Sequence, residues 1–180
     1  FESARLEDIA TRAGVSKGTI YLYFNSKEDI FQALVKGIPQ PNIELLEQVV
    51  QDASVPADVL LRRFLTVVGS FIRDERMKKF PRLFIGEAGR FPHLADIYRN
   101  EVISRAAGLL SSVIERGIRE GRFHPVQPLH AAYAAVAPLL FVAIWQTTFE
   151  RPADGPFDGE GFVSQHIDNF LRGLSRETQS

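Results

Sequence analysis

The chain has 180 residues, of which 45% are hydrophobic and 24% are charged, and its formal net charge is −1. The hydrophobic fraction is large enough for a folded core, which excludes an intrinsically disordered chain. The near-neutral charge excludes polyanion binding by the whole surface, although a local patch can still bind one. The absence of cysteine excludes disulfides, thiol catalysis and cysteine-ligated zinc, and it suits a reducing cytoplasm.

Membrane and targeting segments are not expected. The longest apolar run, Ala131–Trp145, is shorter than the roughly 20 residues that a membrane-spanning helix needs, and it contains Pro138. No signal peptide opens the chain. We therefore expect a cytoplasmic protein.

The first 36 residues predict short helices joined by tight turns. Apolar residues spaced i, i+3, i+4, i+7 from Leu6 predict a helix that ends at Gly14. Ser16 is expected to cap a second helix over Lys17–Phe24, and Ser26 a third. Two helices joined by a short turn that contains glycine form the helix-turn-helix pattern.

The rest of the chain predicts longer helices. Gly37, Pro39 and Pro41 predict a hinge. Beyond it, helices are expected over Ile43–Gln51, Pro56–Asp74, Met77–Glu87, Pro92–Glu120, Pro128–Phe149 and Gly159–Leu174, with a loop over Glu150–Asp158. We therefore expect an all-α fold, with a helix-turn-helix domain over residues 1–37 and a helical bundle over residues 38–180.

The second helix is expected to have two different faces. At 100° per residue, Ile20 and Phe24 point the same way, toward a core, whereas Gly18 and Leu22 lie on the opposite side. A merely solvated face would be richer in Glu, Lys and Gln. Glycine permits close backbone approach, and an apolar side chain can meet a thymine methyl group in a DNA groove.

Polar donors surround this outer face. Thr19 and Tyr21 flank it, and Lys17 and Tyr23 lie nearer the core side. Their hydroxyl and ammonium groups can donate to phosphate oxygens, and Lys27 adds a cation at the start of the next helix. The alternative is that the tyrosines only pack between helices, as aromatic residues in short helices often do.

The segment Leu6–Lys27, LEDIATRAGVSKGTIYLYFNSK, resembles the helix-turn-helix signature of TetR-type transcriptional regulators. That signature has an I-A-x-x-A-G-V-S half followed by G-T-I/L-Y-x-Y/H-F-x-S-K. The resemblance implies a ligand-responsive regulator, most often a repressor, that binds a palindromic operator in double-stranded DNA as a homodimer. It assigns DNA contacts to Arg5, Ser16, Lys17, Gly18, Thr19, Tyr21, Leu22, Tyr23 and Lys27, with Leu22 at the variable position that would set sequence preference.

The chain departs from the family pattern at its start. The family commonly has a Thr or Ser cap at the position of Ala4, and here either Ser3 replaces it or the cap is lost. In the family a whole helix precedes the position of Phe1, and without it Leu6 and Ile20 would lack a third wall. We therefore expect roughly 20–30 further N-terminal residues in the natural protein.

The resemblance also implies an effector pocket in the larger domain. The chain contains 14 phenylalanines, and several of them could line an apolar pocket between helices, although core packing is the alternative for each one. The candidate pocket residues are Phe64, Phe71, Phe80, Phe84, Phe91, Tyr98, Tyr133, Phe141 and Trp145, with Arg82, Glu87, His130 and Gln146 as polar anchors.

Two C-terminal helices are candidates for dimerisation. His130–Phe149 is apolar almost all round, which is typical of a buried helix, and its alanines permit close approach of another helix. The last helix, Gly159–Leu174, gathers apolar residues on one side. In the resembled family, such helices form a four-helix bundle with those of a second copy. The alternative is that both belong to the internal core.

Catalysis and metal binding are not expected. The histidines His93, His124, His130 and His166 are scattered without metal-ligand spacing. The sequence has no glycine-rich phosphate loop and no nucleophile elbow. We therefore expect neither an enzyme nor a cofactor. The alternative function is a helical small-molecule-binding or interaction protein without DNA-binding activity.

Overall fold

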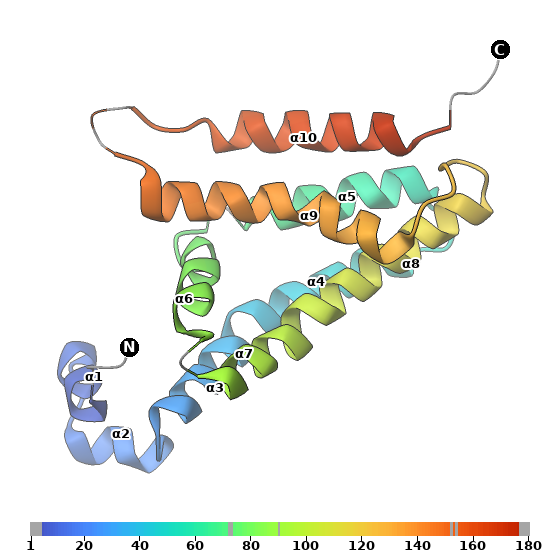
Figure 1. The fold of residues 1–180 in the computed structure, drawn as a ribbon. Coiled ribbons are helices and arrows are strands. Elements are labelled where there is room, and N and C mark those ends of the chain that lie inside the picture. Colours follow the sequence, from blue (N-terminus) through green and yellow to red (C-terminus); the bar gives the residue numbers. More distant parts are fainter. Residues whose placement is uncertain (1–4, 72–73, 90, 152, 154, 177–180) are drawn as a thin grey trace.

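The computed structural model describes residues 5–71, 74–89, 91–151, 153 and 155–176. Within this part of the chain the regular structure is helical, apart from an isolated β-bridge between Phe123 and Ser175. Figure 1 shows a small helical unit at the N-terminal end, two long helices that run side by side through the middle, and two further helices stacked as an outer layer. The predicted all-α fold is confirmed.

The N-terminal unit has the predicted turns and caps. Its helices are α1 (Leu6–Ala13), α2 (Lys17–Tyr23) and α3 (Lys27–Gly37). Gly14 ends α1 with a φ of 70°, a left-handed conformation that glycine adopts without strain. The Ser16 hydroxyl accepts the Thr19 backbone N–H at 3.1 Å, and the Ser26 hydroxyl accepts that of Asp29 at 3.1 Å. These bonds satisfy backbone donors that lack helical partners.

At the start of α1 the usual side-chain cap is lost, which was one of the two outcomes that the sequence left open. The N-cap is Arg5 rather than Ala4, and Ser3 and Ala4 lie outside the described residues. An arginine side chain has no acceptor atom, so it cannot cap the helix itself. Instead, the Asp8 carboxylate accepts the Arg5 backbone N–H at 2.8 Å, which is the reverse half of a capping box.

The predicted break after Gly37 is present, but it is shorter than expected. α3 ends and α4 (Pro39–Gln51) begins on either side of Ile38, so α4 starts four residues earlier than predicted. Proline is tolerated there because the first backbone N–H groups of a helix have no helical partner. The Asn42 side chain donates to the Ile38 carbonyl at 2.9 Å and satisfies an acceptor at the break.

The larger region is a helical bundle in which long helices are joined by the short α6 and α7. Its helices are α5 (Ala57–Ser70), α6 (Phe80–Glu87), α7 (Pro92–Tyr98), α8 (Arg105–Arg119), α9 (Pro128–Ile144) and α10 (Gly159–Leu174). A 3-10 turn over Met77–Lys79 precedes α6, and π-helical segments at Arg99–Ser104 and Trp145–Phe149 join α7 to α8 and extend α9. α4 and α8 are the long pair in the middle of Figure 1, and α9 and α10 are the outer layer.

Three apolar clusters stabilise the fold. The main core lies between α4, α5, α8, α9 and α10 and includes the fully buried Phe64 and Ile114. The second cluster packs Phe31 of α3 against Phe80 and Phe84, so it connects the N-terminal helices to the bundle. The third cluster consists of Leu6, Ala10 and Ile20, with Ile9, Phe24 and Ile30 packed against it.

The third cluster corrects the expectation that Leu6 and Ile20 lack a third wall. Both side chains are buried, because Ile30 from the first turn of α3 packs against the two helices of the motif.

The helix that contains α9 extends over Pro128–Phe149, the bounds that the sequence predicted. Over Pro128–Phe149 it has 22 residues and a mean hydropathy of 1.6 in its most apolar window, enough by length and composition to cross a membrane. Pro138 does not end this helix. Only 28% of that window is buried, so this apolar helix has a large exposed face. The expectation that no run was long enough was therefore wrong.

Candidate DNA-binding surface and effector pocket

The exposed face of α2 is apolar and aromatic where the sequence placed it. Ile20 is buried, whereas Leu22 on the opposite face is 83% exposed. Tyr21 is 43% exposed and Tyr23 is 75% exposed. The reading in which the tyrosines only pack between helices therefore does not describe this surface. Tyr23 is also more exposed than its predicted place near the core side implied, because α2 ends there and the chain turns away into α3.

Packing within the protein does not require a glycine at position 18. A Cβ atom added to Gly18 would lie 3.7 Å from the Ser16 hydroxyl, an ordinary van der Waals contact. The packing of the chain would thus accept a larger residue on this exposed position. A glycine there leaves the backbone open to close approach from outside.

A polar network links α1 to α2. Glu7 accepts the Tyr21 hydroxyl at 3.0 Å and pairs with the Lys17 ammonium at 2.8 Å. The hydrogen bond from Lys17 is the main cause that lowers the pKa of Glu7 to about 2. The bond to Glu7 in turn raises the pKa of Tyr21 and that of Lys17. The Lys17 ammonium also lies 5.7 Å from the centre of the Tyr21 ring.

The remaining predicted DNA contacts lie around this network. The Ser16 and Thr19 hydroxyls are 2.8 Å apart at the start of α2. Arg5 is exposed at the start of α1, and Lys27 is half-buried at the start of α3. The predicted DNA-contacting residues therefore occupy the ends and the exposed side of the helix-turn-helix unit.

The predicted effector-pocket residues fall into three separate places. Phe64 is inside the main core, and Phe71 packs against it. Phe80, Phe84, Phe91 and Tyr98 belong to the second cluster, where Phe84 and Tyr98 stack at 3.8 Å and burial raises the pKa of Tyr98 to about 12. Tyr133, Phe141 and Trp145 are exposed on the helix over Pro128–Phe149.

The predicted polar anchors are also dispersed. Arg82 on α6 donates to the Thr147 backbone carbonyl, which ties α6 to the end of the α9 helix. His130 is exposed in the first turn of α9, and the side chain of Glu87 lies outside the described part of the structure. Gln146 is the one predicted residue that lines the pocket described next.

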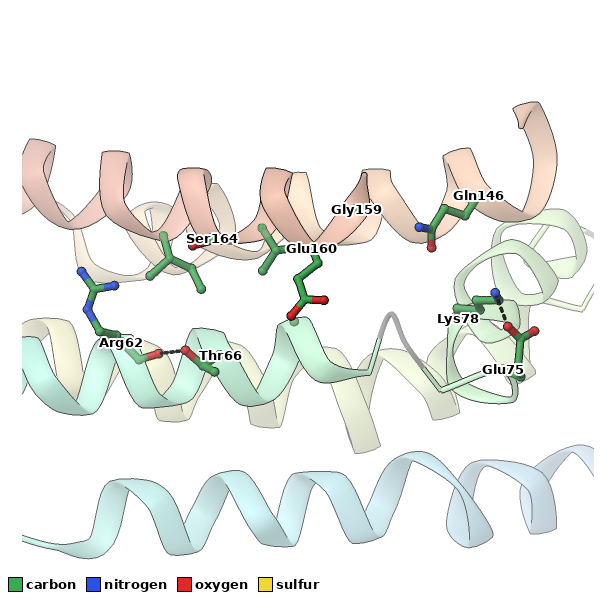
Figure 2. Close-up of a pocket in the computed structure, with 11 residues that line it drawn as sticks. Arg62, Thr66, Glu75, Lys78, Gln146, Gly159, Glu160 and Ser164 are labelled. Atoms are coloured by element: carbon green, nitrogen blue, oxygen red, sulfur yellow. Dashed lines mark hydrogen bonds and ion pairs between the residues drawn. The ribbon is translucent and has the colours of Figure 1, made fainter. Parts of the chain in front are cut away.

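That pocket has a volume of about 400 Å³ and lies between α5, the turn before α6, and α10. Figure 2 shows Arg62 and Thr66 on α5 facing Ser164 on α10, with Gln146 and the Glu75–Lys78 ion pair at the far end. The lining residues are Arg62, Thr66, Gly69, Glu75, Lys78, Gln146, Gly159, Glu160, Val163, Ser164 and Ile167. Sequence reasoning looked for aromatic walls and missed this mostly polar lining.

Two glycines line this pocket where neighbouring helices pack closely. A Cβ atom on Gly69 would come within 2.6 Å of Val163, and one on Gly159 within 2.7 Å of Gln146. These glycines allow α5, α9 and α10 to approach closely. Among the described residues, no group of three or more His, Asp or Glu side chains is placed to hold a metal ion.

Comparison with known families decides the class of protein. Residues 1–34 match the family described as bacterial regulatory proteins, tetR family, and residues 59–172 match the C-terminal domain of AefR-like transcriptional repressors. The chain belongs to the TetR family. The resemblance drawn from the helix-turn-helix signature is confirmed, and the second match covers more than half of the chain.

Individual TetR-family relatives are distant. The chain is 27% identical over 137 residues to YfiR of Bacillus subtilis, an uncharacterized HTH-type transcriptional regulator, and the match covers 72% of this chain and 62% of YfiR. It is 29% identical over 119 residues to the HTH-type transcriptional repressor BepR of Brucella suis, covering 62% of this chain and 57% of BepR. The matched segments thus span less than two thirds of both relatives.

A solved structure shares the whole fold. The SmeT–triclosan complex superimposes with a TM-score of 0.77 at 20% sequence identity, covering 98% of this chain and 84% of that chain. At this identity the likeness establishes the arrangement of helices. It carries no residue-level information about what this chain binds.

Proposed function

We propose that this TetR-family protein is a ligand-responsive DNA-binding regulator that acts as a homodimeric repressor in the cytoplasm. The observation that carries the proposal is the exposed face of α2, where an 83% exposed leucine stands among hydroxyl and ammonium donors. Membership of the TetR family and the repressor BepR among its relatives support the regulatory role.

The α2 face supplies the chemistry that a DNA groove needs. Lys17, Thr19, Tyr21 and Tyr23 provide donors for phosphate oxygens, which fix the position of the helix on the duplex. Leu22 at the centre of the face is the side chain that contacts base edges, since an apolar group can meet a thymine methyl. We place the DNA-binding domain at residues 1–37 and the effector and dimerisation domain at residues 38–180.

The exposed apolar side of the helix over Pro128–Phe149, together with Phe157 and Phe162, is here called the α9 face. A second copy of the chain is its proposed partner. This face carries a run of neighbouring aromatic rings. The distances between ring centres are 5.9 Å for Phe141 and Trp145, 5.8 Å for Trp145 and Phe149, 6.1 Å for Trp145 and Phe157, and 5.8 Å for Phe157 and Phe162. Exposed apolar patches of this kind mark protein interfaces. Two copies joined here would present two α2 helices to two operator half-sites, as a palindrome requires.

A small molecule is the proposed signal. The pocket between α5 and α10 is large enough for one, and the related SmeT structure is a complex with triclosan. Since the lining of this pocket is mostly polar, an effector with polar groups fits it better than a purely apolar one. The pocket also touches the turn before α6, and α6 contacts α3 through Phe84 and Phe31, whose rings meet edge to face at 4.6 Å. That contact offers a route from the effector to the DNA-binding helices.

The test is binding of the full-length protein to a palindromic duplex selected from a random pool. We expect salt-dependent binding that Tyr21→Ala and Lys27→Ala each weaken, because each loses a phosphate contact. Lys79→Ala is the matched control, since Lys79 is an exposed cation far from α2 and its loss should leave affinity unchanged. Undiminished binding by both test variants would contradict the assigned surface. Absence of any selected duplex would favour a helical ligand-binding protein without DNA-binding activity.

A further inference from the structure

Two proposed phosphate contacts in α2 already share an acceptor within the chain. The Tyr21 hydroxyl and the Lys17 ammonium both reach Oε1 of Glu7, at 3.0 Å and 2.8 Å. Glu7 belongs to α1, so it reaches across the turn of the motif to the side of α2 that carries these donors. The free protein therefore holds an anionic oxygen at the donors that are proposed to bind DNA.

A phosphate oxygen would need the same donors. Lysine has three N–H donors, so Lys17 can contact Glu7 and a phosphate together. Tyrosine has one O–H donor, so Tyr21 cannot donate to both. A carboxylate beside a phosphate also repels it. Binding of DNA through Tyr21 thus requires that the bond to Glu7 breaks.

The position of Glu7 allows a DNA phosphate to replace it as the acceptor for Tyr21. Its side chain is 37% exposed, so solvent and a ligand reach it without unfolding of the motif. The hydrogen bond from Lys17 keeps its pKa low, at about 2, so the carboxylate is charged at any pH near neutrality. The competition between Glu7 and a DNA phosphate therefore does not change across the physiological pH range.

We propose that Glu7 is an internal competitor for DNA phosphate, which occupies Tyr21 and Lys17 in the free protein and is displaced when the duplex binds. The inference rests on the proposed DNA-binding function and adds a residue that opposes it. The competition acts on phosphate contacts, which every sequence shares, so it weakens binding to all duplexes alike. Its effect is to keep non-specific binding low while base contacts by Leu22 retain their discrimination.

The first test measures binding of the full-length protein to a random-sequence duplex by fluorescence anisotropy over a series of KCl concentrations. We expect Glu7→Gln to bind about 3- to 10-fold more tightly, since one exposed charged contact no longer competes. The slope of the logarithm of the DNA-binding constant against the logarithm of the KCl concentration should steepen by about 0.9, the contribution of one phosphate contact. Glu115→Gln on α8, whose carboxylate pairs with Arg119 at 3.6 Å, removes the same charge far from α2 and should change affinity less than about twofold.

The partners of Glu7 provide a second test. In a Tyr21→Phe background, Glu7→Gln should increase affinity less than it does in the wild type, because one of the two contested donors is gone. An equal or weaker affinity for Glu7→Gln than for the wild type would overturn the inference. It would mean that Glu7 orders the two donors for DNA instead of competing for them.

A titration without DNA separates this inference from the proposed function. The bond to Glu7 raises the pKa of Tyr21, so Glu7→Gln should lower that pKa in an NMR titration of the free protein, with Tyr21→Phe used to assign the signal. No change would overturn the inference and leave the proposed function standing. A lowered Tyr21 pKa together with no duplex binding by any variant would overturn both. Tighter binding by Glu7→Gln with a lowered Tyr21 pKa would support both.

Discussion

Two exposed surfaces of this protein carry aromatic residues, and they differ in what surrounds the rings. On α2, Tyr21 and Tyr23 follow Lys17, Gly18 and Thr19, and Tyr21 donates a hydrogen bond. On the α9 face, Phe141, Trp145 and Phe149 stand one helical turn apart, and each ring neighbours the next. Exposed aromatic content alone therefore does not identify a partner. The hydrogen-bond donors on and beside the rings separate the two surfaces, because a phosphate backbone needs such donors and an apolar interface leaves them unpaired.

The largest effect is expected from a charged residue introduced on the α9 face. We expect Phe141→Asp to weaken the homodimer at least about 100-fold, since an unpaired carboxylate would be buried against apolar side chains. Sedimentation equilibrium of the purified protein measures the change. Ile85→Asp is the matched control, because Ile85 is an exposed apolar residue on α6, outside this face. An unchanged dimer in Phe141→Asp would place the interface elsewhere.

The same variant tests the link between the two surfaces. If α9 joins the copies, then Phe141→Asp should also lose binding to a palindromic duplex, while binding to a single half-site stays close to that of a wild-type monomer. Retention of full palindrome binding by a proven monomer would contradict the proposed geometry.

Leu22→Ala should have a smaller and more selective effect. Loss of an apolar base contact is expected to reduce affinity for the selected duplex by about 1–3 kcal/mol, and to leave affinity for random DNA unchanged. Competition binding with both duplexes measures the ratio. Leu45→Ala, at an exposed leucine on α4, should change neither value. An equal loss on both duplexes would assign Leu22 to general contact instead of sequence preference.

Local sequence signals predicted the N-terminal unit well. Ser16, Gly14 and Ser26 act through bonds within a few residues, so their roles are visible in the chain itself. The family signature covered the same segment. At α1 the sequence left open whether Ser3 caps the helix or the cap is lost. The N-cap is Arg5, and the reverse bond to Asp8 compensates for the missing side-chain cap.

The pocket was not predictable by the same means. Its lining brings α5, the turn before α6 and α10 together, and the contacts between them depend on tertiary packing. The aromatic residues that suggested a pocket lie in the core, as Phe64 does, or on the surface, as Trp145 does. Aromatic composition does not distinguish these environments, since all of them favour large apolar side chains. Whether the predicted residues contact an effector stays a prediction.

The smallest expected effect concerns Glu7 and the stability of the motif. Its pKa in the folded protein is about 2, below the ordinary value of 4.5, so its bonds to Lys17 and Tyr21 stabilise the native state above pH 4.5. That contribution should decline as the pH falls below 4.5 and disappear as it passes through about 2. Wild type should therefore be slightly more stable than Glu7→Gln at pH 7, and the two should converge in acid. Urea unfolding at pH 7 and pH 3 measures the difference, and it should be small because the pair is exposed. Together with tighter DNA binding by Glu7→Gln, such a loss would mean that the carboxylate stabilises the free motif at the expense of its affinity, whereas equal stability at pH 7 would contradict the bonded geometry.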